Sequence, residues 1–143
     1  MNLTKNFSMR ELTRSATADR LGILNEPTKA IAANLQELAT TVLQPIRDKW
    51  GEPIIVTSGY RCSKLNAAVG GAKASQHMLG QAADIHTVSD KVSENYKLFE
   101  LIRQMVEKGE LQVGQLIDEY GYNWVHVSTP HLKNNNQVKH IKK

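Results

Sequence analysis

The chain has 143 residues, 41% of them hydrophobic, which is enough for one compact domain with its own apolar core. Its single cysteine, Cys62, excludes an intramolecular disulfide and a cysteine-rich zinc finger, so any metal must be held by histidines and carboxylates. The formal net charge of +4 favours polyanions by long-range attraction but identifies no partner.

The N-terminal residues 1–7 lack the apolar run of a secretion signal. No later segment approaches the roughly 18 apolar residues that a membrane span needs. We therefore expect synthesis in the cytoplasm and no membrane partner.

The first predicted elements are helices. Ser8 is followed three residues later by Glu11, which is the capping-box spacing of a helix start. Apolar residues in the segment 31–46 recur at intervals of three and four, which predicts the main core helix, ending near Gly51. Pro45 lies inside this helix and would kink or break it.

Strands and a second helix follow. The β-branched segment 52–58 predicts a strand, and apolar residues at helical spacing predict a helix over 93–108. The segments 112–119 and 123–128 predict two strands joined by a tight turn at Gly121. This order indicates a single α+β domain with a small, mainly antiparallel sheet.

The last segment, 131–143, is polar and basic. We expect it to be a solvated tail outside a domain core of about 7–130. His131 and His140 lie in this tail, so both are expected to be solvated.

The most informative segment runs from Ser75 to His86. It places His77 and Asp84 on either side of a bend at Gly80, so a strand entered at Ala82 would return Asp84 towards His77. His86 has the same strand parity as Asp84 and is the reserve ligand.

The best candidate for a third ligand is His126, because its neighbours Val125 and Val127 point to the opposite face of the strand. A lone histidine in an apolar strand is more often structural. Two histidines and one carboxylate, however, leave a fourth tetrahedral position for water, as a catalytic zinc site requires. The candidate cofactor is therefore Zn²⁺, which would activate that water and polarise a substrate carbonyl.

Together these motifs resemble the zinc D-alanyl-D-alanine carboxypeptidase-like peptidases, whose fold also includes the vancomycin-resistance dipeptidases and the hedgehog signalling domain. The resemblance covers nearly the whole chain and implies His77, Asp84 and His126 as metal ligands. It also implies that Arg61, in a Ser-Gly-Tyr-Arg segment, engages the substrate and the developing oxyanion. The matching residues are Ser75, His77, Gly80, Ala82 and Asp84, then Trp124 and His126, with Ser58, Gly59, Tyr60 and Arg61 upstream.

A general base must stand near the activated water. Glu119 is the first choice, because the predicted hairpin places it beside the strand of His126, and the resemblance supports this position. One branch of the family has its carboxylate three residues before the last histidine, where this chain has Asn123. Asp118 therefore remains a possible substitute, and Glu119 could instead be a solvated charge at a strand end.

The resemblance implies hydrolysis of amide bonds in the peptide stem of bacterial peptidoglycan, either as a carboxypeptidase or as a phage endolysin-type endopeptidase. The enzyme would reach the wall after phage-type release or by another export route. A non-catalytic zinc- or cell-wall-binding module of the same fold is the alternative. We expect a monomer without a nucleic-acid partner, because no basic stripe with interleaved aromatics is visible. Cys62 is rejected as a nucleophile, because the sequence places no base beside it.

Overall fold

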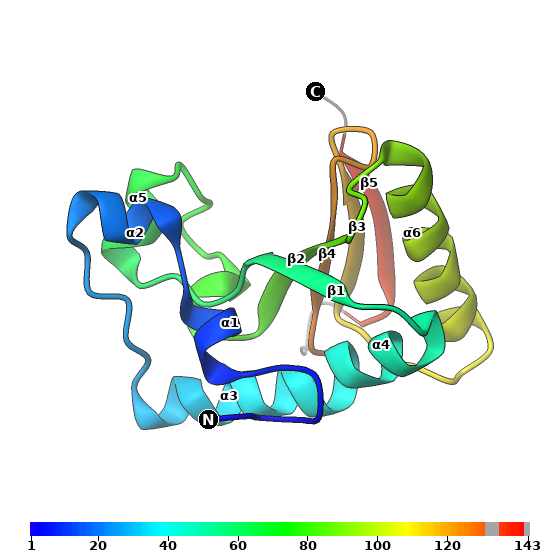
Figure 1. Ribbon diagram of the computed structural model, residues 1–143, viewed down its shortest axis with the longest axis horizontal. Coiled ribbons are helices and arrows are strands. Elements are labelled where there is room, and N and C mark those ends of the chain that lie inside the picture. Colours follow the sequence, from blue (N-terminus) through cyan, green and yellow to red (C-terminus); the bar gives the residue numbers. More distant parts are fainter. Residues whose placement is uncertain (131–134, 142–143) are drawn as a thin grey trace.

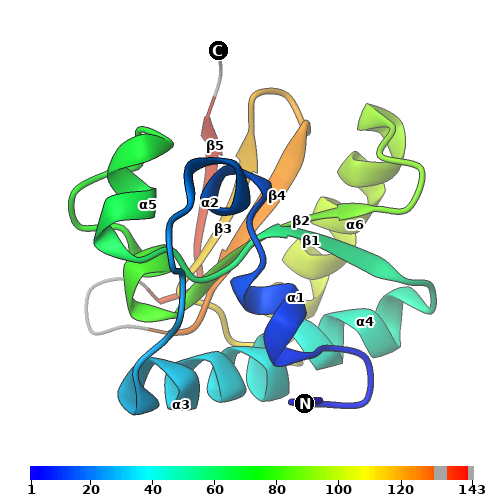
Figure 2. The same ribbon diagram turned by 60° about the vertical axis from the view of Figure 1, so that its left-hand side comes forward.

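The computed structural model describes residues 1–130 and 135–141. A five-stranded sheet carries the long helix α6 on one face, while α3 and α4 run beneath it (Figure 1). α2 and α5 form a separate group of short helices, and α1 lies against β1 and α3. Figure 2 shows α2 and α5 on the side of the sheet away from α6. This is the α+β domain that the sequence predicts.

The helices account for most of the first half of the chain. The α-helices are α1 (Met9–Thr13), α2 (Ala16–Leu21), α3 (Lys29–Leu38), α4 (Gln44–Trp50), α5 (Ser63–Ala68) and α6 (Val92–Glu107), with a π-helical segment η1 (Ala39–Leu43) and a 3₁₀-helix η2 (Gln76–Leu79).

The sheet has the strand order β1-β2-β4-β3-β5. The first four strands pair antiparallel, whereas β5 runs parallel to β3. The strands are β1 (Ile54–Ser58), β2 (Ala82–Thr87), β3 (Gln115–Glu119), β4 (Trp124–Ser128) and β5 (Gln137–Ile141).

Strand alternation separates the core face of the sheet from its open face. Ala83, Ile85, Val125 and Val127 are fully buried, and they lie in the same apolar core as residues of α6. The intervening residues of β2 and β4 therefore point to the other face, towards the group of short helices.

The predicted helix starts and ends agree with the structure. Ser8 and Glu11 form a reciprocal capping box at the start of α1. The core helix runs without a break from α3 through η1 to α4, and Pro45 lies in the first turn of α4. Proline has no N–H, so Pro45 cannot donate a backbone hydrogen bond to the preceding turn. The wider π-helical turn before it allows the helix to continue without that bond.

The C-terminal segment differs from the predicted solvated tail. Residues 137–141 form β5, which pairs with β3 along its outer edge. The side chain of His140 contacts the buried Asp118 carboxylate, so this histidine is not simply solvated. Residues 131–134, with His131, and residues 142–143 lie outside the described residues.

Within the described parts of the chain, none of the helices is both long enough and apolar enough to cross a membrane.

Candidate metal centre and cleft

Three side chains converge on one point above the open face of the sheet. His77 comes from η2, Asp84 from β2 and His126 from β4, and one ligand atom from each lies within 4.8 Å of the others. Oδ1 of Asp84 is 3.4 Å from Nε2 of His77 and 3.1 Å from Nδ1 of His126. These are the three residues that the sequence predicts as metal ligands.

The local sequence explains this convergence. Ser75 caps η2 by accepting a hydrogen bond from the backbone N–H of His77. Gly80 ends η2 with φ of 70°, and a Cβ there would lie only 2.9 Å from the carbonyl oxygen of Ile31. Glycine therefore allows the chain to turn tightly against α3 and enter β2.

Sheet register then completes the cluster. Asp84 and His126 are direct partners across the β2–β4 pair, so their side chains leave the same face side by side. The rings of His77 and His126 lie 5.2 Å apart, edge to face.

His77 is held in one orientation. Its Nδ1 lies 2.7 Å from the carbonyl oxygen of Gly59, and a carbonyl only accepts, so Nδ1–H is the donor. Nε2 is therefore the ring nitrogen that faces Asp84. A backbone carbonyl that fixes the tautomer in this way is a common support of metal-binding histidines.

The Asp84 carboxylate stays ionised although its side chain is only 14% exposed. Burial alone would raise its pKa, but hydrogen bonds from His126 and His77 outweigh burial and hold the pKa well below the usual range. An ionised carboxylate beside two imidazoles is an attractive site for a divalent cation.

This donor set fits zinc. Zn²⁺ is bound in proteins by imidazole nitrogen and carboxylate oxygen, and catalytic sites use three such ligands with one position left open. The oriented Nε2 of His77, the Asp84 carboxylate and the His126 ring supply that number and type of donor.

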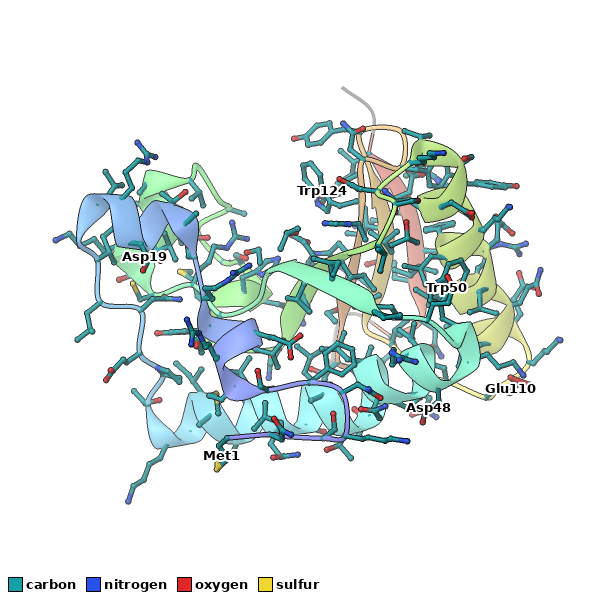
Figure 3. All side chains as sticks on the ribbon, in the orientation of Figure 1. Met1, Asp19, Asp48, Trp50, Glu110 and Trp124 are labelled. Carbon is teal, nitrogen blue, oxygen red and sulfur yellow. The ribbon has the colours of Figure 1, made fainter. Side chains whose placement is uncertain are left out.

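The cluster lies in a cleft of about 580 Å³. Gly70, Gly71 and Ala72 line one part of this cleft, and the aromatic pair Tyr120 and Trp124 lines another, with ring centroids 5.2 Å apart. Figure 3 shows Trp124 beside the gap between the sheet and the group of short helices.

Glu119 also lines this cleft. It is the strand partner of Trp124 and lies on the same face of the sheet as His126. Burial and the negative charge of Asp84 raise the pKa of Glu119, while His126, Trp124 and His77 oppose the shift. A carboxyl group with a raised pKa is suited to both accepting and returning a proton.

Asp118, the alternative base, occupies a different environment. Its side chain points to the opposite face, where it contacts His140 and accepts a hydrogen bond from the backbone N–H of Tyr122 at 3.3 Å. It does not line the cleft. The structure thus separates the two candidate bases and leaves only Glu119 near the cluster.

Arg61 also lines the cleft, and its Nη2 lies 3.5 Å from the hydroxyl of Ser75. Burial lowers the pKa of Arg61, while the charges of Asp84 and Glu119 raise it. The guanidinium group is therefore partly desolvated and available to an oxygen of a bound ligand.

The remaining candidates lie away from the cluster. His86 shares the strand face with Asp84, but its Nδ1 lies 2.6 Å from the carbonyl oxygen of Thr87 and 3.4 Å from the Asp90 carboxylate. Cys62 precedes α5 and does not line the cleft. Tyr60 belongs to the core rather than to the cleft wall.

Sequence reasoning missed Asn66, which is 4% exposed and lies beside Arg61. A Cβ on Gly71 would be 2.1 Å from Oδ1 of Asn66 and 3.2 Å from Nη1 of Arg61, so both atoms crowd the same side of this glycine. The adjacent pair Gly70-Gly71 was the signal that could have indicated a close backbone approach.

One comparison with known proteins assigns the chain to a family. A search of curated protein sequences found no match. The model of the family described as Peptidase M15 matches residues 5–128, which include every residue of the cluster as well as Arg61 and Glu119. The chain therefore belongs to the Peptidase M15 family, the zinc D-alanyl-D-alanine carboxypeptidase-like peptidases that its motifs resemble.

Proposed function

We propose that the protein is a zinc-dependent peptidase that hydrolyses amide bonds in the peptide stem of bacterial peptidoglycan. The observation that carries this proposal is the convergence of His77, Asp84 and His126 inside a cleft that also contains Glu119 and Arg61. Family membership supports the peptidase activity.

His77, Asp84 and His126 would hold the ion. A zinc ion in such a site acts as a Lewis acid and makes water a nucleophile near neutral pH.

Glu119 is the proposed general base. It accepts a proton from the attacking water and delivers it to the nitrogen of the leaving amine. The raised pKa of Glu119 supports this role, because the carboxylate must be basic enough to take the proton and acidic enough to return it.

Arg61 is the proposed oxyanion partner. The carbonyl oxygen of the scissile amide gains negative charge as water adds, and a guanidinium group already fixed beside the cluster stabilises this charge without reorganising. The position of Arg61 in the wall of the cleft supports this assignment.

The proposed substrate is a stem peptide of the cell wall. The proposed oligomeric state is a monomer. Release through a phage-type lysis event, or export by another route, would bring it to the wall.

Incubation of metal-analysed protein with purified peptidoglycan, with and without a chelator, tests the proposal. Mass analysis of the released fragments distinguishes carboxypeptidase from endopeptidase cleavage. A single released alanine indicates a carboxypeptidase, and shortened stems indicate an endopeptidase. Wall binding without chelator-sensitive fragments would instead support the non-catalytic module.

A second experiment tests the base. Glu119→Gln should lower the hydrolysis rate by about 10²–10⁴-fold and leave zinc bound, because general-base catalysis contributes a factor of this size. Asp118→Asn is the matched control and should retain most of the rate. A large loss of rate in Asp118→Asn, with most of the rate retained in Glu119→Gln, would identify Asp118 as the base.

A further inference from the structure

The cleft does not end at the metal cluster. A second hollow of about 260 Å³ adjoins it and shares Arg61, Val69 and Asp84 as lining residues. The first hollow extends over β4 and β3, whereas the second is lined by Thr57 and Ser58 of β1. Since the strand order is β1-β2-β4-β3, the first hollow extends from the cluster over β4 and β3, and the second lies on the β1 side of Asp84.

This arrangement has a direct consequence for the length of the substrate. A pocket that ended at the cluster would admit only a terminal residue on that side. A second hollow on the β1 side of Asp84 offers room for further substrate on the far side of the scissile bond.

The second hollow is positively charged. Arg14 and Arg61 both line it, and the only carboxylate in its lining is Asp84. The charge of Asp84 acts on Arg61, and two arginines with this one carboxylate still leave a net positive charge in the lining.

The side chain of Arg14 has no polar partner among the described residues. Within residues 1–130 and 135–141, its guanidinium group makes no hydrogen bond or ion pair, although its backbone N–H caps α1 at the carbonyl of Arg10. Thr17, the second residue of α2, adds a hydroxyl to the same hollow. An arginine fork beside a hydroxyl suits a carboxylate, which it can bind through two parallel hydrogen bonds.

We propose that this second hollow is a carboxylate-binding subsite, in which Arg14 holds a free carboxylate of the peptide substrate on the β1 side of the scissile bond. The proposal rests on the peptidase function proposed above and deepens it. The preferred substrate is then an acidic peptide longer than a dipeptide.

The test measures binding of synthetic stem peptides to the zinc-loaded Glu119→Gln protein, in which hydrolysis is blocked, by titration calorimetry. Each free carboxylate of the peptide is converted to a carboxamide, one at a time. One of these conversions should weaken binding by roughly tenfold, which is the size expected for loss of a charge-assisted contact.

Three further substitutions, each combined with Glu119→Gln, assign this effect to the subsite. Arg14→Gln should abolish the difference between the carboxylate and carboxamide peptides, and Arg14→Lys should restore part of it. Arg10→Gln removes the same charge one helical turn earlier, outside the hollow, and should keep the difference.

Equal affinities for all the peptides, or a difference that survives Arg14→Gln, would overturn the subsite. The proposed function fails separately, if the wild-type protein shows no chelator-sensitive cleavage of the same peptides. Binding that depends on Arg14 would in that case still establish the subsite.

Discussion

The backbone N–H of Arg61 donates a hydrogen bond to the backbone carbonyl of His77 at 3.0 Å. The imidazole of His77 donates in turn to the carbonyl of Gly59, two residues before Arg61. Two hydrogen bonds thus tie the segment after β1 to η2. The proposed oxyanion partner and one proposed ligand are therefore positioned as a single unit.

The first prediction concerns the metal ligands. Substituting His77, Asp84 or His126 by alanine should weaken zinc binding by at least about 100-fold, because even the loss of groups that support ligands costs about 10–100-fold. Metal analysis after competition with a chelator gives the affinity. His86→Ala is the control, since His86 lies on the same strand face but outside the cluster. Zinc loss in this control together with zinc retention in His77→Ala would refute the assignment.

The second prediction concerns pH and stability. Burial and the charge of Asp84 raise the pKa of Glu119, so the folded protein holds this proton more tightly than the unfolded chain does. The stabilising contribution is fully present below the unfolded pKa of about 4.3 and is lost as pH rises through the higher folded pKa.

Metal-free Glu119→Gln should therefore be more stable than the wild type at neutral pH, and its advantage should shrink in acid. Urea denaturation of both metal-free proteins at several pH values measures this difference. An advantage that does not change with pH would show that the carboxyl group is not perturbed in the way described.

The third prediction concerns Gly71. Gly71→Ala should lower kcat/KM while the protein stays folded, because the new Cβ would displace the Asn66 amide and the Arg61 guanidinium group. Kinetics and circular dichroism on the same samples separate the two effects. In an Arg61→Ala background the same substitution should cost little further activity, because the group that it displaces is already absent. If the two substitutions instead lower kcat/KM additively, Gly71 acts through a group other than Arg61.

The fourth prediction concerns β5. His140→Ala removes a partner of the buried Asp118 carboxylate, which among the described residues then keeps only the N–H of Tyr122. The free energy of unfolding should fall by about 1–3 kcal/mol, the cost of leaving a buried polar group poorly satisfied. Lys139→Ala, on the neighbouring residue of the same strand, is the control for urea denaturation and should change stability by less than about 0.5 kcal/mol. Equal effects would mean that the contact with Asp118 contributes nothing.

Local signals in the sequence explain the elements that were predicted correctly. The apolar repeat in 31–46 and the capping box at Ser8 depend only on neighbouring residues, and both correspond to helices in the structure. The strand alternation around His126 likewise identifies β4 and the side from which its histidine points.

The elements that were missed depend on distant contacts. β5 buries little of its own surface, so its residues carry no apolar pattern, and it forms because the outer edge of β3 offers unpaired backbone groups. α5 begins without a side-chain cap, so no start signal precedes it.

The candidate site also combines features that follow from local sequence with features that depend on distant contacts. The spacing of His77, Gly80 and Asp84 was sufficient to predict a bend that returns one side chain to the other. The contact of Asn66 with the space beside Gly71, and the hollow between Arg14 and β1, arise only when separate segments pack together. The assignment of Glu119 as base and Arg61 as oxyanion partner stays a prediction that the experiments above address.

The cluster also joins parts of the chain that are far apart in sequence. Asp84 and His126 are separated by 42 positions, and α6 and β3 lie between them. A cation shared by these side chains would act as a cross-link that closes this long loop, in a chain whose single cysteine cannot form an internal disulfide. Removal of the metal should then expose the loop to proteolysis, so the availability of zinc would govern the lifetime of the protein as well as its chemistry.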